Sequence, residues 1–342
     1  MKFLSDVSLA NYSTMRLGGK AAFVTEIHDR RELTEALAWA EERKLPVIMI
    51  GGGSNIVWRD EGFDGLLLVN KVMRYEVFDE DETNYYVTIG AGENWDNTVA
   101  RMVEAGLSGT EALSLIPGTA GATPIQNVGA YGQEIANTLV TVEAYDTTTK
   151  SFVTIPNADC AFGYRTSRFK TTDKGRFFIT AITLHLSRTN LQPPFYADLE
   201  AYFSEHKITE FTPQATRLAV IDIRSRKLPD PAHVANSGSF LANPVVDNNT
   251  FMQLEDTYSN IQHWRIDDNH VKLAAGWLLE QAGFKGYHDP ETGMATWQTH
   301  ALVLVNEHAK STADLLKFKQ KLVGAVQTKF GVTLVQEPEM LP

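Results

Sequence analysis

The glycine-rich loop SLIPGTAGATPIQNVGAYGQE, residues 114–134, constrains the fold more than any other part of this 342-residue chain. Its four glycines and two prolines leave no apolar period for a helix or strand. Loops of this length are uncommon in compact domains and tend to be functional. Small residues let backbone donors approach a ligand, and Gln126 and Asn127 can both donate and accept. We therefore expect contact with an extended, polar, partly aromatic ligand such as a flavin ring or a pyrophosphate.

Length and composition narrow the class of protein. The chain is long enough for two or three domains. Its net charge of −11 disfavours nucleic acid as a partner, and no apolar run is long enough to insert into a membrane. The amino-terminal sequence turns polar at Ser5, before a signal-peptide core could form, and the single cysteine, Cys160, allows no internal disulfide. We expect a cytoplasmic globular protein.

Apolar periodicity predicts a mixed α+β organisation. Helical spacing is found over residues 29–45, 93–107, 212–228, 271–287 and 312–331. Strand-like segments are residues 45–50, 66–70, 85–92, a hairpin over 139–155, and 177–187, 300–306 and 331–342. Pro229 and Pro231 should end the third helix, and they mark an expected domain boundary.

Two glycine-rich turns follow predicted strands, which is where phosphate-binding loops occur. They are GGGSN, residues 51–55, and GAGENW, residues 90–95. Ile56 and Trp95 stand where a dinucleotide fingerprint has its third glycine, and no Walker motif is present. GGGSN therefore has two readings, a purely structural turn and a phosphate-binding loop.

Arginines and a serine supply further candidates for chemistry. CAFGYRTSRFK places Arg165 and Arg168 beside aromatic residues, where a fixed guanidinium suits a carboxylate or phosphate. The basic run IRSRK, residues 223–227, favours either solvent or an anionic ligand. NSGSFLANP, residues 236–244, reads as a cap and turn or as the site of a catalytic serine.

Acidic and metal-binding residue types give weaker signals. Glu337 and Glu339 alternate along the predicted last strand, so we expect their side chains on one face. The nine histidines and Cys160 show no metal-ligand spacing, and we predict no metal site.

Nine segments, taken together and in order, resemble the UDP-N-acetylenolpyruvoylglucosamine reductase family. They are GGGSN, GAGENW, IPGTAGATPIQNVGAYG, FGYRTSRF, RSRKLPDP, GSFLANP, KLAAGWLLEQ, HALVLVN and EPE. Each is modest alone, but the ordered set spans most of the chain. The resemblance implies NADPH-dependent reduction of UDP-N-acetylglucosamine enolpyruvate to UDP-N-acetylmuramate in bacterial peptidoglycan synthesis, and so a role in cell-wall biogenesis, cell shape and division.

The resemblance also implies an α+β architecture with a vanillyl-alcohol-oxidase/PCMH-type FAD-binding fold. Its first subdomain would span residues 1–70, completed by a carboxy-terminal strand at 331–342. The second would span residues 71–228, and an α+β substrate-binding domain would span residues 229–330. FAD would be bound non-covalently, with NADPH as co-substrate, and we expect a monomer.

Site residues follow from the same resemblance. Ser239 would protonate the substrate, Arg165 would stabilise the developing enolate, and Glu339 would complete the catalytic set. Tyr196, Lys227 and Asn243 would contact the UDP-sugar. The implied cofactor-binding residues are Gly51, Gly52, Gly53, Ser54, Asn55, Ile116, Pro117, Gly118, Thr119, Gly121, Ala122, Thr123, Ile125, Gln126, Asn127, Gly129, Ala130, Tyr131, Gly132 and Arg224.

Two details refine the comparison with the family. PPFYADLEAYF, which contains Tyr196, looks like the substrate-covering loop of the longer, type I members. GSFLANP departs from the usual GSFFKNP, because Leu241 and Ala242 replace an aromatic residue and a lysine. Two other functions compete with the reductase: a flavin-dependent oxidase of the same fold, and a non-catalytic nucleotide-sugar-binding protein.

Overall fold

The chain forms two compact units in the computed structural model, which describes residues 1–81 and 84–342. Unit 1 comprises Met1–Val7, Ala21–Gly52 and Asp64–Ser225, and unit 2 comprises Ser8–Lys20, Gly53–Phe63 and Arg226–Pro342. The GGGSN turn therefore contributes residues to both units. The three-part division expected from the sequence stays a prediction.

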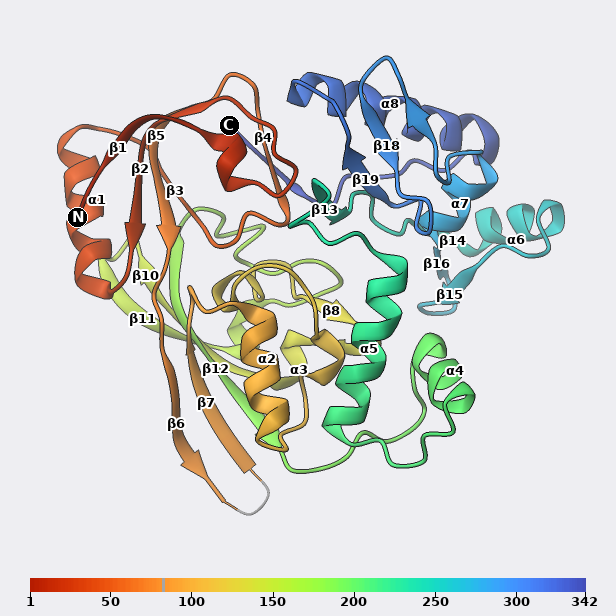
Figure 1. Ribbon diagram of the computed structural model, residues 1–342, viewed down its shortest axis with the longest axis horizontal. Helices are drawn as coiled ribbons and strands as arrows, with labels where there is room; N and C mark the ends of the chain where they lie inside the picture. The colour runs from red at the N-terminus through yellow and green to blue at the C-terminus, as the bar shows by residue number, and fades with distance from the viewer. Residues whose placement is uncertain (82–83) are drawn as a thin grey trace. The chain divides into compact units, whose positions relative to one another are not determined.

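Unit 1 begins with a four-stranded sheet that is covered by one helix (Figure 1). The strand order is β1 (Leu4–Ser8), β2 (Lys20–Ile27), β5 (Phe63–Asn70) and β3 (Val47–Ile50), with β3 and β5 parallel. Helix α1 (Arg30–Glu42) starts where Asp29 accepts a hydrogen bond from the Glu32 amide, and it buries Leu33, Ala36 and Ala40 against the sheet.

A five-stranded antiparallel sheet follows, in the order β11-β10-β12-β7-β6. Its strands are β6 (Tyr75–Glu80), β7 (Asn84–Gly90), β10 (Leu139–Asp146), β11 (Ser151–Pro156) and β12 (Phe177–Ser187). Asp146 pairs with Ser151 across the β10–β11 turn, so the predicted hairpin is confirmed. The mixed α+β organisation is confirmed as well.

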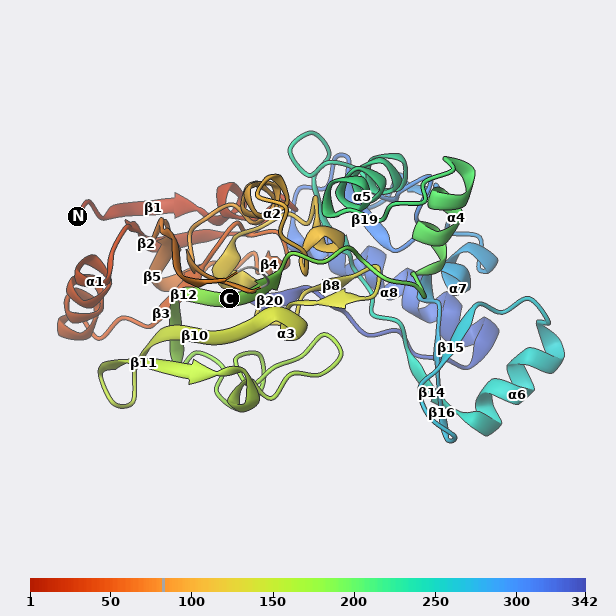
Figure 2. The same cartoon turned by 90° about the horizontal axis from the view of Figure 1, so that it is seen from below.

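Within the described residues, four further α-helices belong to unit 1, and the last of them extends two residues beyond it. They are α2 (Trp95–Glu104), α3 (Ile135–Thr138), α4 (Ala197–Glu205) and α5 (Pro213–Lys227). Asn94 caps α2 as predicted, since its side chain accepts from the Asn97 amide. Helix α4 packs beside α5 through Leu199, Phe203 and Val220 (Figure 2). The short pair β8 (Gly129–Ala130) and β9 (Gln133–Glu134) lies within the glycine-rich loop.

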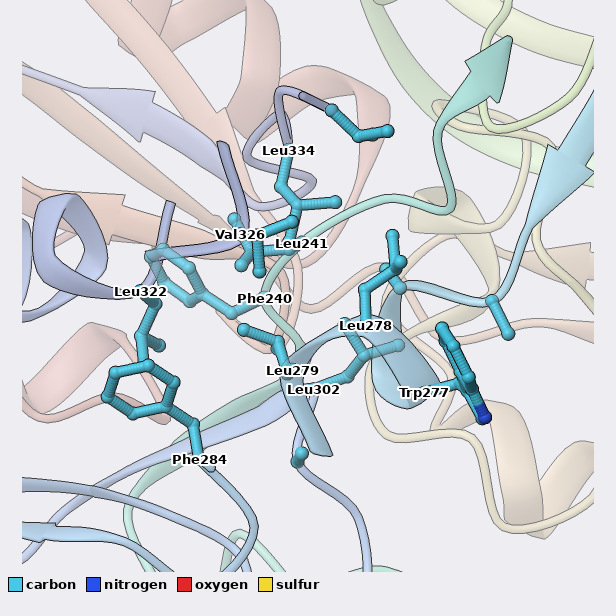
Figure 3. Close-up of a cluster of buried hydrophobic side chains, with 14 of the residues drawn as sticks. Phe240, Leu241, Trp277, Leu278, Leu279, Phe284, Leu302, Leu322, Val326 and Leu334 are labelled. Atoms are coloured by element: carbon cyan, nitrogen blue, oxygen red, sulfur yellow. The ribbon is translucent and has the colours of Figure 1, made fainter. Parts of the chain in front are cut away.

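Unit 2 is organised around one large apolar cluster, part of which Figure 3 shows. Phe240, Leu241, Leu278 and Leu322 are buried there. The helices are α6 (Asn248–Thr257), α7 (Ala275–Gln281) and α8 (Thr312–Phe330). The strands are β4 (Ile56–Trp58), β13 (Asn236–Ser239), β14 (Val245–Asp247), β15 (His263–Arg265), β16 (His270–Leu273), β17 (His288–Asp289), β18 (Met294–Thr296), β19 (Val303–Asn306) and β20 (Glu339–Leu341).

Two sequence-based assignments in unit 2 were wrong. The helix expected over residues 271–287 covers only Ala275–Gln281, because Val271 and Leu273 lie in β16 between β14 and β15. The strand expected over residues 331–342 is confined to Glu339–Leu341, the segment that pairs in parallel with β4. Glu337 therefore lies outside the strand, and the alternation argument for Glu337 and Glu339 does not hold.

None of the helices found in residues 1–81 and 84–342 is both long and apolar enough to cross a membrane.

Candidate functional site

The glycine-rich loop and the GGGSN turn meet through atoms that leave no room for a side chain. A β-carbon on Gly51 would lie 2.1 Å from the Thr119 hydroxyl oxygen, and one on Gly52 would lie 3.0 Å from the Gly118 α-carbon. Glycine at positions 51 and 52 therefore permits the close approach of two backbone segments within unit 1.

The GAGENW turn supports the same part of the loop. The Trp95 amide donates to the Gly118 carbonyl over 3.1 Å, and the Ala120 amide donates to the Glu93 carbonyl over 2.9 Å. The Gly121 amide donates to the Ala91 carbonyl over 3.0 Å. This turn therefore holds the loop through its backbone, and it need not contact a ligand itself.

We call the close contact of Gly51 and Gly52 with Gly118 and Thr119 the cradle, and one of its polar atoms is unsatisfied within the described residues. The Thr119 hydroxyl oxygen is buried, and within the described part of the chain it makes no hydrogen bond. A buried polar group without a partner is unfavourable by about 1–3 kcal/mol, so such a group usually indicates a ligand or water. The bare glycine backbone and the Thr119 hydroxyl together fit the phosphates of a dinucleotide such as FAD.

The second half of the loop is held by Asn127. This residue is buried with a φ of 49°, and its side-chain nitrogen donates to Glu134 over 2.8 Å and to the Gly163 carbonyl over 3.1 Å. Its side-chain oxygen accepts from the Ala136 amide over 3.2 Å. The amide of Asn127 is thus engaged within the protein, which leaves its backbone for any ligand contact. Lys170 Nζ lies 3.4 Å from the Gln126 side-chain oxygen.

Arg165 adopts a left-handed backbone conformation, with a φ of 53°. Its guanidinium donates to the Gly129 carbonyl over 2.9 Å and lies 5.4 Å from the centre of the Tyr164 ring. The Ser167 hydroxyl donates to the Ile125 carbonyl over 2.6 Å. The structure therefore brings the FGYRTSRF segment, and with it Arg165, against the glycine-rich loop.

Ion pairs secure the far side of the Arg165 segment. Arg168 binds Asp173 over 2.6 Å, and Arg176 binds both Asp173 and Asp146. Arg176 reaches the two oxygens of Asp146 over 2.9 and 2.8 Å, and Asp146 is almost fully buried. These bonds to Arg176 hold the pKa of Asp146 well below its usual range, although desolvation opposes the shift. Arg168 is thus a structural residue here.

Arg224 and two tyrosines form an aromatic and cationic cluster in unit 1. Tyr131 and Tyr196 stand nearly perpendicular, with ring centres 5.7 Å apart, and burial raises the pKa of both hydroxyls. Burial lowers the pKa of Arg224, and the Tyr131 hydroxyl and Asp96 oppose that shift. Arg224 Nε is buried, and no described residue accepts a hydrogen bond from it. The cluster suits an anionic or polar group of a ligand.

Tyr196 stands at the start of a helix rather than inside a long loop. It is the residue before α4, and 40% of its surface is exposed. Within PPFYADLEAYF only residues 193–196 are irregular, and the rest of this segment lies in α4.

In unit 2, Ser239 is the last residue of β13 and is partly exposed. A register irregularity separates Asn236 from Ser239, and Gly238 between them has a φ of 70°. The buried Asn236 side chain shapes this bulge, because it accepts from the Gly238 amide over 2.9 Å and donates to the Val234 carbonyl over 2.7 Å. The next residue, Phe240, is fully buried.

The Ser239 segment runs beside the segment that carries the carboxy-terminal glutamates. The Glu337 amide donates to the Phe240 carbonyl over 3.0 Å, and the Ala242 amide donates to the Val335 carbonyl over 2.8 Å. Glu339 opens β20, where its amide donates to the Asn55 carbonyl over 3.0 Å. The structure therefore places GSFLANP, EPE and the second half of GGGSN in one region of unit 2.

The two other predicted substrate contacts also have structural bonds. The Asn243 side-chain oxygen accepts from the Ala275 amide over 3.0 Å, at the start of α7. The Lys227 carbonyl accepts from the Thr299 hydroxyl over 2.7 Å, while the Lys227 side chain is exposed at the end of α5. Leu241, which departs from the family pattern, is buried in the large apolar cluster of unit 2.

Sequence reasoning missed Asp96 and Lys170. Asp96 reads as an ordinary acidic residue in the first turn of a helix, but its carboxylate binds the guanidinium of Arg217 on another helix. Lys170 follows Arg165 by five residues in no recognisable motif, although Lys170 Nζ lies 3.5 Å from the Arg165 carbonyl. Only tertiary structure identifies either residue.

Comparison with known proteins bears on these features. An FAD binding domain family matches residues 21–152, and the family of the UDP-N-acetylenolpyruvoylglucosamine reductase C-terminal domain matches residues 230–341. The first match covers GGGSN, GAGENW and the glycine-rich loop. The second match covers Ser239, Asn243 and Glu339. FAD as the cofactor and the FAD-binding α+β fold, both expected from the sequence, are confirmed.

Relatives match over nearly the whole chain. UDP-N-acetylenolpyruvoylglucosamine reductase of Ralstonia nicotianae is 39% identical, over 97% of this chain and 97% of its own. The enzyme of the same name from Dechloromonas aromatica is 40% identical, over 98% and 99%. The crystal structure of the Thermus caldophilus reductase matches over 100% of both chains with a TM-score of 0.69 and 23% identity. At this identity the likeness shows the fold alone. The resemblance carried by the nine segments is confirmed.

Proposed function

The chain belongs to the UDP-N-acetylenolpyruvoylglucosamine reductase family, and we propose that it reduces UDP-N-acetylglucosamine enolpyruvate to UDP-N-acetylmuramate with NADPH. What supports this proposal most is the full-length agreement with relatives of that name, together with a Ser239 segment that pairs beside the EPE segment. The reaction would serve peptidoglycan synthesis in the cytoplasm of a bacterium, and through the cell wall it would support cell shape and division.

Reduction of an enolpyruvyl group adds a hydride to one carbon of the double bond and a proton to the other. When bound, FAD would supply this hydride, with NADPH as the reductant of the flavin. The residues proposed to hold FAD are those of the cradle, above all Gly51, Gly52, Gly118 and Thr119. Their backbone groups and the Thr119 hydroxyl would contact the phosphates.

We assign the stabilisation of negative charge to Arg165. As hydride arrives, charge builds toward the substrate carboxylate, and a guanidinium that binds this enolate more strongly than the substrate lowers the barrier. The left-handed backbone and the bond to the Gly129 carbonyl fix the guanidinium before substrate arrives. Such preorganisation avoids rearrangement during the reaction.

We assign the proton to the Ser239 hydroxyl. Serine has a high intrinsic pKa, so it can act as an acid only toward a strongly basic carbanion and with neighbours that stabilise its alkoxide. The bulge at Gly238 turns the chain so that Ser239 is partly exposed although Phe240 is fully buried. Glu339 is assigned to the same catalytic set, and Tyr196, Lys227 and Asn243 are assigned to the UDP-sugar.

Stopped-flow absorbance of the bound flavin tests this assignment, because it separates the two half-reactions. We expect Ser239→Ala to be reduced by NADPH at nearly the wild-type rate, and to be reoxidised by UDP-N-acetylglucosamine enolpyruvate about a hundred- to a thousand-fold more slowly. Wild-type rates in both half-reactions would overturn the role of Ser239.

Ser259→Ala is the matched control. Ser259 belongs to the same unit and is exposed in the turn that follows α6, away from β13. Removal of an exposed hydroxyl outside the Ser239 segment should leave both half-reactions intact. Failure of wild-type protein to bind FAD, or to be reoxidised by the enolpyruvate, would overturn the proposed reaction as a whole.

A further inference from the structure

Asp96 binds two distant parts of unit 1 at once. One of its carboxylate oxygens accepts from Arg217 over 2.7 Å and from the Leu115 amide over 2.6 Å, and the other accepts from Arg217 over 3.1 Å. Asp96 lies in the first turn of α2, Arg217 lies on α5, and Leu115 is the second residue of the glycine-rich loop. Figure 1 shows α2 and α5 side by side, and Figure 2 looks along both helices.

This contact is a largely buried, two-pronged ion pair rather than a surface bridge. The exposed fractions are 15% for the Arg217 side chain and 25% for that of Asp96. Burial alone would raise the pKa of Asp96, but Arg217, the Leu115 amide and the charge of Arg224 together lower it. Asp96 is thus ionised at neutral pH, and removal of its charge would leave Arg217 buried without its partner.

The bond to Leu115 acts where the backbone is strained. Leu115 has a φ of 57°, which is unfavourable for a residue with a β-carbon, and its side chain is 37% exposed and therefore not held by the core. A residue in this region persists only when its surroundings impose it. The hydrogen bond from the Leu115 amide to Asp96 is such a constraint.

The residues that follow Leu115 are those of the cradle. Gly118 and Thr119 lie three and four residues later, against Gly51 and Gly52. The direction in which the chain leaves Leu115 therefore decides where the Thr119 hydroxyl and the Gly118 backbone stand. If Leu115 took another backbone conformation, Gly118 and Thr119 would no longer lie against Gly51 and Gly52.

Helix α5 reaches the far end of the same loop through a second arginine. Arg224 follows Arg217 by seven residues, about two helical turns, so the two guanidinium groups lie on one face of α5. Arg224 interacts with the Tyr131 hydroxyl, and it also feels the charge of Asp96. One face of α5 thus contacts the far end of the loop through Arg224, and it is linked to the start of the loop through Asp96, which binds both Arg217 and the Leu115 amide.

We propose that Asp96, through Arg217 and the Leu115 amide, is a positioning residue that sets the glycine-rich loop in its FAD-binding conformation. This inference rests on the proposed function, because it assumes that the cradle holds FAD. Asp96 touches neither the cofactor nor the substrate in this account. Its contribution is to the affinity for FAD and to the environment in which the flavin is held.

Titration of apoprotein with FAD, followed by quenching of flavin fluorescence, measures this effect. Asp96→Asn removes the charge but can keep the acceptor, and we expect it to raise the Kd for FAD about 10-fold. Asp96→Ala removes both, and we expect a rise of about 30- to 100-fold. The visible circular dichroism of bound flavin should change in both variants, since the ring is held differently.

Asp29→Ala is the control matched to Asp96→Ala. Asp29 is the N-terminal cap of α1 in the same unit, where it accepts from the Glu32 amide over 2.7 Å. Loss of this cap should lower the free energy of unfolding by about 0.5–2 kcal/mol without any change in the Kd for FAD. A comparable rise in Kd for Asp29→Ala would show that general destabilisation explains the effect, and it would overturn the proposal.

A rescue experiment separates positioning from mere stabilisation. Glycine adopts the left-handed conformation without penalty, so Leu115→Gly should need Asp96 less. We expect the effect of Asp96→Ala on the Kd to shrink to about 3-fold in the Leu115→Gly background. An undiminished effect would contradict the role assigned to Leu115.

The remaining outcomes are also decisive. If Asp96→Asn does not fold, Arg217→Lys takes its place in the experiment. Lysine keeps the positive charge but loses the two-pronged geometry of the guanidinium. We expect Arg217→Lys to raise the Kd for FAD about 3- to 10-fold. A wild-type Kd in a folded Asp96→Asn or Arg217→Lys protein would refute the proposal alone. If the wild-type protein does not bind FAD, the proposed function fails first and this inference falls with it.

Discussion

The segments that carry Arg165 and Ser239 are held in place by different forces. Arg165 sits in a left-handed conformation between an exposed Tyr164 and a polar Thr166, and its apolar anchor, Phe169, comes four residues later. Hydrogen bonds and ion pairs hold most of the segment around Arg165 in place. Ser239 immediately precedes Phe240 and Leu241, which are buried in the large cluster of unit 2 (Figure 3).

This difference indicates in which of the two segments a substitution can change activity without a large change in the free energy of unfolding. Around Arg165, polar bonds specify geometry but contribute modestly to the free energy of unfolding. Around Ser239, the side chains that place the hydroxyl also form part of the core. Substitutions near Arg165 should therefore affect activity more than stability, and substitutions beside Ser239 should affect both.

The largest expected effect compares the aromatic neighbours of the two residues. Phe240→Ala should lower the free energy of unfolding by about 3–5 kcal/mol, because Phe240 is fully buried and its removal leaves a cavity. Tyr164→Ala, next to Arg165 and 42% exposed, should lower it by about 1 kcal/mol at most. Urea denaturation followed by circular dichroism measures both. Equal losses would break the comparison.

The next prediction concerns activity at Arg165. Arg165→Lys keeps a positive charge but loses the planar fork, so we expect turnover to fall about 100-fold while the free energy of unfolding changes by about 0.5 kcal/mol or less. Steady-state kinetics and urea denaturation provide the two numbers. Arg31→Lys, at an exposed position on α1, is the control and should leave both unchanged. Loss of stability in parallel with activity would contradict the separation.

The smallest expected effect is on how the free energy of unfolding depends on pH. It concerns the Asp146–Arg176 pair, which helps to hold the segment around Arg165. Because Arg176 holds the pKa of Asp146 below its unfolded value, this pair stabilises the fold fully above about pH 5. That stability is lost as pH falls below about 4, since the unfolded chain takes up the proton first. The urea midpoint should therefore fall between pH 7 and pH 3.5.

Asp146→Asn should show a smaller fall in the urea midpoint over the same pH interval, because its side chain cannot ionise. Asp64→Asn, at an exposed position on β5, should retain the wild-type fall. Identical pH profiles for all three proteins would remove Asp146 from the set of residues that fasten this segment.

Much of the fold could be predicted because its signals are local. The apolar spacing of α1, the Asn94 cap of α2 and the turn between β10 and β11 each lie within a few residues. The helix assignment was wrong at Val271 and Leu273. Their spacing from the apolar residues of α7 also fits a helix, but both residues are buried in the core from strand β16. Only the neighbouring strands β14 and β15 decide between the two structures.

The site was less accessible to sequence reasoning. Composition identified the glycine-rich loop, and family motifs supplied Arg165, Ser239 and Glu339, whose roles stay predictions. The fastening of the loop could not be predicted, because Arg217 is 121 positions from Asp96 and no period links them. The side chain of Asn127 illustrates the same limit, since its partners are fixed by tertiary structure.

The pairing of β4 with β20 determines how late in synthesis unit 2 can finish folding. Its partner β20 is made about 280 residues later, and the Asp60 carboxylate accepts from the Thr312 and Ala313 amides at the start of α8. At about 5–20 residues per second, the ribosome would expose β4 for roughly 15–60 s before its partner emerges. The apolar Val57 and Trp58 of this strand are then a natural target for chaperones on the nascent chain.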